Sequence, residues 1–122
     1  MTSRGLVALA ILVILVPHQT GAEPTLIRTT HPLDDARGYC LDVAGFGPNA
    51  RIDEPLRMHT CKYGEELGDQ LFERVADTRN IRLPDFDRCL AVEALTPGAA
   101  LMAANCDDND LQQWEFDWGQ LR

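Results

Sequence analysis

The stretch Cys40-Leu41-Asp42-Val43 is followed by Cys61 and then by Gln70-Leu71-Phe72. The same order returns later in the chain, as Cys89-Leu90-Ala91-Val92, Cys106 and Gln112-Gln113-Trp114. A shared Ile/Leu-Arg step brackets the two units, at Ile27-Arg28, Ile81-Arg82 and Leu121-Arg122. Self-similarity at a period of roughly forty to fifty residues indicates a repeat architecture, and it decides the fold before any local pattern does.

Residues 1–22 are expected to lie outside this fold, because they have the features of a secretory signal peptide. Arg4 gives a positive start, residues 6–16 form an apolar run too short to span a bilayer, and small residues precede a cut after Ala22. A retained membrane anchor is the alternative. No second apolar stretch follows, so we expect residues 23–122 to form a secreted, extracellular domain that does not insert into membranes.

The four cysteines all follow the predicted signal peptide. An even number of cysteines in a small exported domain, whose core is marginal, argues for disulfides. Several connectivities are open. The repeat favours Cys40–Cys61 and Cys89–Cys106, because each bridge then has the same place in its unit. A zinc site is disfavoured, since no pair has the C-x₂-C spacing.

The chain is acidic, with 19 Asp and Glu against 11 Lys and Arg, a formal net charge of −8. Removing the leader takes away Arg4 and no acidic residue. Such a chain would repel nucleic acid and anionic membranes, and it suits a neutral or cationic partner. Solubility outside the cell is the simpler explanation of the charge itself.

Short apolar or alternating runs between turn residues predict an all-β domain. One run places Leu56, Met58 and Thr60 on the inner face of a half-buried strand, with Arg57 and His59 on the other. We expect strands at residues 25–30, 39–43, 56–60, 70–75, 81–83, 89–92, 100–104 and 113–117. They form two four-stranded repeats, at about 25–75 and 80–118, and the start of a third.

Within each unit, the residue types suggest different roles. Phe72 and Trp114 are large enough to fill the centre of a small barrel. The glutamine that precedes each of them, Gln70 or Gln112, can hydrogen-bond local backbone and hold the loop before it. Val43 is expected to pack inward while Asp42 points the other way.

The ordered set of Cys-Leu-Asp-Val, a second Cys and Gln-x-aromatic resembles the ricin-B-type β-trefoil lectins, over roughly residues 25–122. The resemblance implies the same disulfides within each unit. It also implies a third repeat, yet this sequence stops where that repeat would begin, at residues 119–122. An open barrel edge favours pairing. A homo-oligomer that completes the trefoil is one expectation, and a truncated product is the other.

The resemblance further implies a shallow sugar site in each unit. Its carboxylate, flat side chain and amide would match a sugar's hydroxyl pairs and C–H face. The corresponding residues of the first unit are Asp42, His59, Asp69 and Gln70, with Arg57 as a further donor. His59 replaces an aromatic platform, and Asp69 replaces an amide. These five residues form the predicted carbohydrate-binding site, and glycans or glycoproteins are the predicted partners.

The matching residues of the second unit are Ala91, Ala104, Leu111 and Gln112, which keep only the glutamine. We expect no sugar site there, and no partner around Gln112, so that its replacement by alanine is without effect.

Nothing in the sequence indicates catalysis, a cofactor or a metal. No arrangement of Ser/His/Asp or Cys/His with a free nucleophile is visible. The acidic run at residues 107–110 lacks the spacing of a calcium loop. The leading interpretation is therefore a lectin and not an enzyme. The alternative is a trefoil scaffold that contacts proteins, for example as an inhibitor, and the His59 position separates the two.

Overall fold

The computed structural model describes residue 10 and residues 23–64, 66–117 and 120–121. The predicted signal peptide, residues 1–22, lies outside the described residues except for residue 10. The described chain consists of short antiparallel strands and 3₁₀ turns, which confirms the all-β class. Within these ranges, no helix has the length and apolar character needed to cross a membrane.

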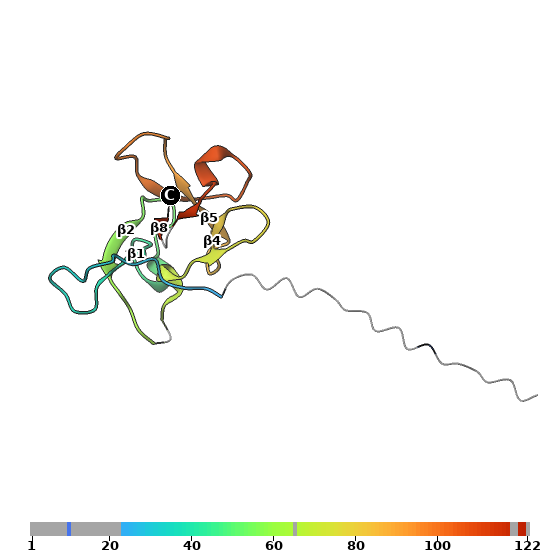
Figure 1. Ribbon diagram of the computed structural model, residues 1–122. Coiled ribbons are helices and arrows are strands. Elements are labelled where there is room, and N and C mark those ends of the chain that lie inside the picture. Colours follow the sequence, from blue (N-terminus) through green and yellow to red (C-terminus); the bar gives the residue numbers. More distant parts are fainter. Residues whose placement is uncertain (1–9, 11–22, 65, 118–119, 122) are drawn as a thin grey trace, which may run out of the picture.

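The strands form three antiparallel sheets around which the loops radiate (Figure 1). In order, the strands are β1 (Tyr39–Asp42), β2 (Arg57–Thr60), β3 (Glu73–Arg74), β4 (Ile81–Leu83), β5 (Arg88–Val92), β6 (Leu101–Ala104), β7 (Phe116–Asp117) and β8 (Gln120–Leu121). The 3₁₀ turns are η1 (Gly47–Asn49), η2 (Gly68–Gln70) and η3 (Asp110–Gln112). The sheets are β1-β2, β3-β4-β5-β6 and β7-β8, so the four-stranded sheet runs from the first unit into the second.

Most predicted strands are found within one or two residues of their expected ends. The strand expected at residues 113–117 is shortened to β7, and three further expectations were wrong. Residues 25–30 form only isolated bridges, Thr25 with Phe72 and Arg28 with Cys40. The predicted strand at 70–75 is shortened to β3, because Gln70 belongs to η2. Met58, expected inside, is exposed. Its sheet has only two strands, so one face of β2 lacks cover.

The core takes its side chains from β1, β4, β5 and β6 and from the residues next to β1 and β3. Its buried members are Leu41, Val43, Phe72, Ile81, Leu83, Leu90 and Ala103. Phe72 is fully buried, as predicted, and Trp114 packs against the cluster while its indole N–H donates to the carbonyl of Leu90 over 2.9 Å. Both Gln-x-aromatic steps thus deliver their aromatic ring to a common apolar centre, where buried area contributes most of the stability.

Both predicted disulfides are present, Cys40–Cys61 and Cys89–Cys106. Each has a Cα–Cα distance of 4.9 Å, within the range that disulfides adopt. Cys40 and Cys89 lie in β1 and β5, and each partner lies just beyond the following strand. The two bridges therefore have equivalent places, as the repeat required.

Two glycines shape the loops beside the first-unit site. Gly45 follows β1 with a φ of +88°, and a Cβ there would lie 2.3 Å from the carbonyl oxygen of Asn49. Gly68 opens η2, where a Cβ would lie 1.7 Å from Oδ2 of Asp85. Only glycine fits this close approach without moving Asp85. The contact brings the loop before β5 against the turn that carries Asp69 and Gln70.

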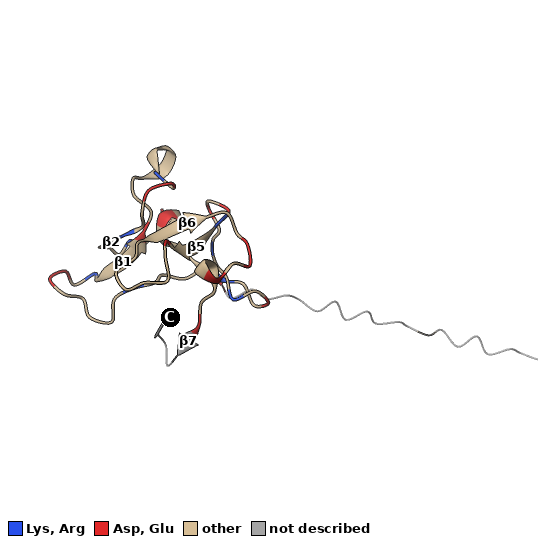
Figure 2. Ribbon diagram, turned by 90° about the horizontal axis from the view of Figure 1, so that it is seen from above, with Lys and Arg blue, Asp and Glu red and all other residues tan. Residues whose placement is uncertain are grey.

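Charged residues occur mainly on the loops (Figure 2). Asp and Glu occur on several of them, with Lys and Arg between. In the described part of the chain, acidic and basic positions thus alternate over several loops.

Candidate functional site

Gln70 is the anchor of the predicted site. It ends η2, and its fully buried amide joins this turn to β1 and to the segment around Cys61. Its Nε2 donates to Oδ2 of Asp42 over 2.7 Å and to the carbonyl of Thr60 over 3.1 Å, and its Oε1 accepts from the N–H of Lys62 over 2.9 Å. The two backbone bonds flank Cys61, so Gln70 holds the loop before it, as the sequence predicted.

Gln112 repeats this arrangement in the second unit. Its Oε1 accepts from the N–H of Asp107 over 3.0 Å, and its Nε2 donates to the carbonyl of Asn105 over 2.7 Å. These bonds flank Cys106 as those of Gln70 flank Cys61. The expectation that Gln112 has no partner was wrong, since a buried amide needs partners and finds them in the backbone. The difference between the units is the carboxylate, because Ala91 stands where Asp42 does.

Asp42, the last residue of β1, is only 1% exposed. Its Oδ2 accepts from Gln70, while Oδ1 has no hydrogen-bond partner among the described residues. Arg57 lies directly opposite across the β1–β2 pair, with Nε 3.6 Å from Oδ1, which is an ion pair beyond hydrogen-bonding distance. Oδ1 of Asp42 is therefore a buried hydrogen-bond acceptor without a donor in the described part of the chain.

Asp69 is joined to Lys62, a residue that the sequence reasoning missed. Lys62 Nζ forms an ion pair and a hydrogen bond with Oδ2 of Asp69, whose side chain is buried. The ammonium also lies over the ring of Phe46, 4.9 Å from its centroid. An amide at position 69 would supply a hydrogen-bond donor, which the Asp69 carboxylate lacks. The ammonium of Lys62 supplies a donor, with a positive charge, at this place. The signal was available: Lys62 is the single lysine of the chain, and it directly follows Cys61.

A shallow hollow of about 430 Å³ lies beside this buried pair. It is lined by Arg37, Phe46, the residues 59–63 and Glu66. His59 belongs to it and is exposed, with Nδ1 3.3 Å from the hydroxyl of Thr60. Of the five predicted site residues, only His59 lines the hollow. Asp42, Asp69 and Gln70 are buried, and Arg57 does not belong to the lining. Lys62 connects the two parts, since it lines the hollow and contacts Asp69.

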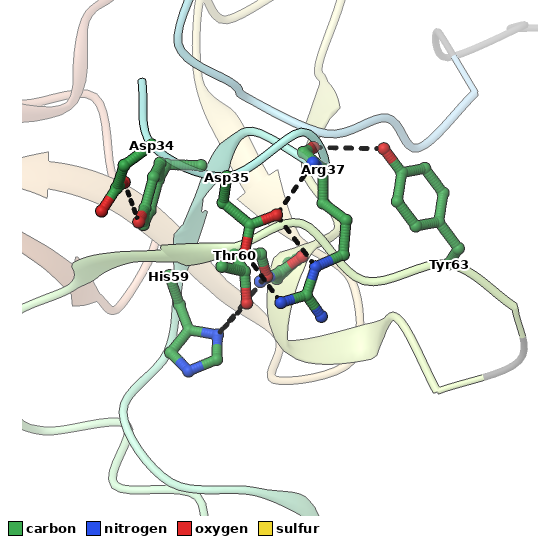
Figure 3. A network of polar contacts seen from close by, with 8 residues as sticks. Asp34, Asp35, Arg37, His59, Thr60 and Tyr63 are labelled. Carbon is green, nitrogen blue, oxygen red and sulfur yellow. Dashed lines mark hydrogen bonds and ion pairs between the residues drawn. The ribbon is translucent and has the colours of Figure 1, made fainter. Parts of the chain in front are cut away.

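One wall of the hollow is fixed by the loop that precedes β1 (Figure 3). Arg37 donates from Nε and Nη2 to the carboxylate of Asp35, over 3.1 and 2.8 Å, and this hydrogen bonding lowers the pKa of Asp35 to about 2. Tyr39 donates to Asp34 over 2.6 Å, a bond that raises the pKa of Tyr39. The Tyr63 hydroxyl donates to the carbonyl of Arg37 over 3.2 Å.

Comparison with known protein families gives a match over most of the chain. Residues 30–122 match the family described as the ricin-type beta-trefoil lectin domain. The chain belongs to this family. A search of curated proteins finds no match.

Membership of the ricin-type family makes the chain a carbohydrate-binding module in general terms, of a non-catalytic type. It agrees with the all-β fold and with the two disulfides. No group of three or more His, Cys, Asp or Glu in the described part of the chain is placed to hold a metal ion.

Proposed function

We propose that the chain is a secreted lectin whose domain spans residues 23–122, after a signal peptide at 1–22. Glycans or glycoproteins are its partners, and they bind at the first unit. The two disulfides support an oxidising location outside the cell. The acidic surface supports a neutral ligand.

The single observation that carries this proposal is the unsatisfied Oδ1 of Asp42. A buried carboxylate oxygen without a donor costs about 1–3 kcal/mol, so the site gains when a ligand supplies one. A sugar hydroxyl is such a donor, and charge-assisted hydrogen bonds are the stronger kind. Arg57 is half-exposed and only ion-paired to this oxygen, so a hydroxyl would replace a weak contact.

The other residues of the site have complementary roles in the proposal. His59 offers a flat, exposed face for the C–H side of the sugar. Lys62 and Arg57 can donate to ring hydroxyls, and the unsatisfied Oδ1 of Asp69 can accept from one. Gln70 holds the Asp42 carboxylate in place through Oδ2. In the second unit Ala91 removes the carboxylate, so no sugar site is proposed there.

A glycan array and calorimetric titration of residues 23–122 test the proposal. Asp42→Asn removes the charge with little change of volume and should weaken binding at least tenfold, since the lost hydrogen bonds are worth about 1.5–3 kcal/mol. Asp108→Asn is the matched control, because it makes the same charge change on the exposed loop after Cys106. Equal binding by both variants would place the site elsewhere.

A protein-binding scaffold is the second candidate, and the near-complete burial of Asp42 favours it. In that case the exposed rings of Phe46 and Tyr63 would contact a protein surface instead of a sugar. Failure of every glycan on the array to bind the folded chain would favour this function.

We also propose that copies of the chain associate. Residues 25–30 pair with the rest of the described chain only through two isolated bridges. Backbone groups left unpaired at such an edge favour pairing with another chain.

A further inference from the structure

The hollow beside the first-unit site is larger than the proposed sugar contact requires. Its volume, about 430 Å³, lies within the range of about 300–1,000 Å³ that accommodates drug-sized ligands. A single hexose is smaller than such a ligand. The lining that the Asp42 site does not use is formed by Arg37, Tyr63 and Glu66.

Two separate aromatic faces line the hollow. Phe46 is 50% exposed and contacts Lys62, whose ammonium reaches Asp69 and so belongs to the buried polar cluster. Tyr63 is 66% exposed and contacts Arg37, which comes from the loop before β1. Figure 3 shows His59 and Tyr63 on either side of Arg37. The Tyr63 ring is therefore a flat face of the hollow that is separate from the one at His59.

The Tyr63 face is held in position before any ligand arrives. Its hydroxyl is fixed by the Arg37 carbonyl, and the Arg37 side chain is fixed by two hydrogen bonds to Asp35. A third bond, from the N–H of Arg37 to Oδ1 of Asp35 over 2.9 Å, holds the backbone between them. A ring that is already positioned loses little conformational entropy when a ligand stacks on it. Nη1 of Arg37 has no hydrogen-bond partner in the described part of the chain, so it can donate to a hydroxyl.

The charges at this face favour a neutral ligand. The positive charge of Arg37 is matched by Asp35 in a paired contact, and Glu66 adds a negative charge to the lining. The whole chain carries a net charge of −8. A carboxylated or sulfated sugar would meet no unmatched cation at Tyr63, and the surrounding field would repel it.

We propose that Tyr63 and Arg37 form a second subsite for a neutral sugar unit, so that the protein recognises at least a disaccharide. The first unit of that glycan occupies the site at Asp42 and His59, and the second stacks on Tyr63 while Nη1 of Arg37 donates to it. This inference rests on the proposed function of the Asp42 site.

Titration calorimetry on residues 23–122 tests the subsite with matched sugars. The probes are glucose, galactose and mannose, each compared with neutral disaccharides that carry it at the non-reducing or the reducing end: cellobiose, maltose, lactose, melibiose and mannobiose. For the hexose that binds, one disaccharide should bind about fivefold or more tightly than the hexose alone, the gain expected of one stacking contact. Tyr63→Ala should abolish this gain and leave hexose affinity unchanged. Asp42→Asn should lower the affinity for both the hexose and the disaccharide.

Two further variants separate stacking from a general effect. Tyr63→Phe keeps the ring but loses the hydrogen bond that positions it, and it should keep part of the gain. Leu95→Ala removes another exposed large apolar side chain, which does not line the hollow. It should leave the affinity for both the hexose and the disaccharide unchanged. Because Tyr63 is mostly exposed, both of its variants should retain the thermal midpoint of the parent chain.

The outcomes distinguish the subsite from the site it extends. Equal affinity for hexose and disaccharides, or a gain that survives in Tyr63→Ala, overturns the subsite and leaves the Asp42 site standing. Binding of no sugar by the folded chain overturns both. Tighter binding of a uronic acid disaccharide than of its neutral counterpart overturns the neutral chemistry assigned to this face.

Discussion

The side-chain amide of Gln70 donates a 2.7 Å hydrogen bond to Oδ2 of Asp42, joining two buried residues that are 28 positions apart. The same amide group also bonds the backbone on both sides of Cys61. Gln70 therefore fixes the fold of its loop and the orientation of the carboxylate together. Gln112 fixes the fold of its own loop but orients no carboxylate, because Ala91 has no polar side chain to accept a hydrogen bond from it.

Both glutamines should stabilise the fold, and Gln70 should do so more. Gln70→Ala and Gln112→Ala each leave backbone groups without their partner, which we expect to lower the free energy of unfolding by about 2 kcal/mol. Gln70→Ala should cost about 1 kcal/mol more, because Asp42 also loses its donor. Urea unfolding followed by tryptophan fluorescence measures both. Gln113→Ala is the control, since that side chain bonds only the exposed Arg79. A Gln112→Ala chain with the parent's unfolding midpoint would contradict the assigned role.

Lys62 and Asp69 should behave as a coupled pair. Lys62→Met leaves the buried Asp69 carboxylate without its cation and should lower the free energy of unfolding by about 2 kcal/mol, less than the ~3–5 kcal/mol of a fully buried pair. Adding Asp69→Asn should restore much of that loss, because the charge that needed Lys62 is gone. Chemical unfolding of both single variants and the double variant measures the coupling.

Arg51→Met is the matched control for the Lys62 experiment. It breaks an ion pair with Glu54 in which both side chains are about half-exposed, and such pairs contribute about 0–1 kcal/mol. Additive effects of the Lys62 and Asp69 substitutions would show that the two side chains do not depend on each other.

His59→Trp should strengthen glycan binding. The indole offers a larger stacking face than imidazole, and we expect a gain of about three- to tenfold in affinity. His31→Trp adds the same side chain at another exposed histidine, outside the hollow, and should have no effect. Calorimetric titration with the best ligand from the array compares the two. A lower glycan affinity in His59→Trp, with no change in His31→Trp, would mean that the imidazole hydrogen-bonds the sugar and does not stack on it.

The Asp35–Arg37 pair should contribute stability that acid removes. The pKa of Asp35 is lowered from 3.8 to about 2 in the folded chain, first by hydrogen bonding to the Arg37 side chain. Because the folded pKa is the lower one, the contribution is present above about pH 4 and is lost as the pH falls towards 2. The difference in thermal midpoint between the parent and Asp35→Asn should therefore shrink across this window. With Asp108→Asn as the control, a difference that stays constant from pH 5 to pH 2 would exclude the linkage.

Self-association is expected at residues 25–30, which pair with the rest of the described chain only through two isolated bridges. We expect residues 23–122 to sediment as an oligomer at micromolar concentration, because burying apolar surface stabilises a contact by roughly 25 cal/mol per Å². Velocity sedimentation over a range of concentrations measures this directly. A compact, well-folded monomer at every concentration would refute the association.

Part of the fold could be predicted because the chain repeats itself. Equivalent positions in two units need equivalent surroundings, so the pattern alone gave the pairing of Cys40 with Cys61, the buried place of Phe72 and the backbone bonds of Gln70. The expected strand at residues 25–30 failed for a related reason. A strand needs a neighbour along its whole length, and residues 25–30 find one only at Phe72 and Cys40.

The sequence by itself determined the family pattern, the covalent framework and the difference between Asp42 and Ala91, since these follow from residue type and spacing. Only the tertiary structure decided which side chains meet. It buries Asp42, pairs Asp69 with Lys62 and brings Tyr63 to Arg37 across 26 positions. The hollow has no sequence signature, because its lining comes from three separate loops and from β2. Such contacts depend on where the loops are placed once the core has formed, and local patterns do not encode that placement.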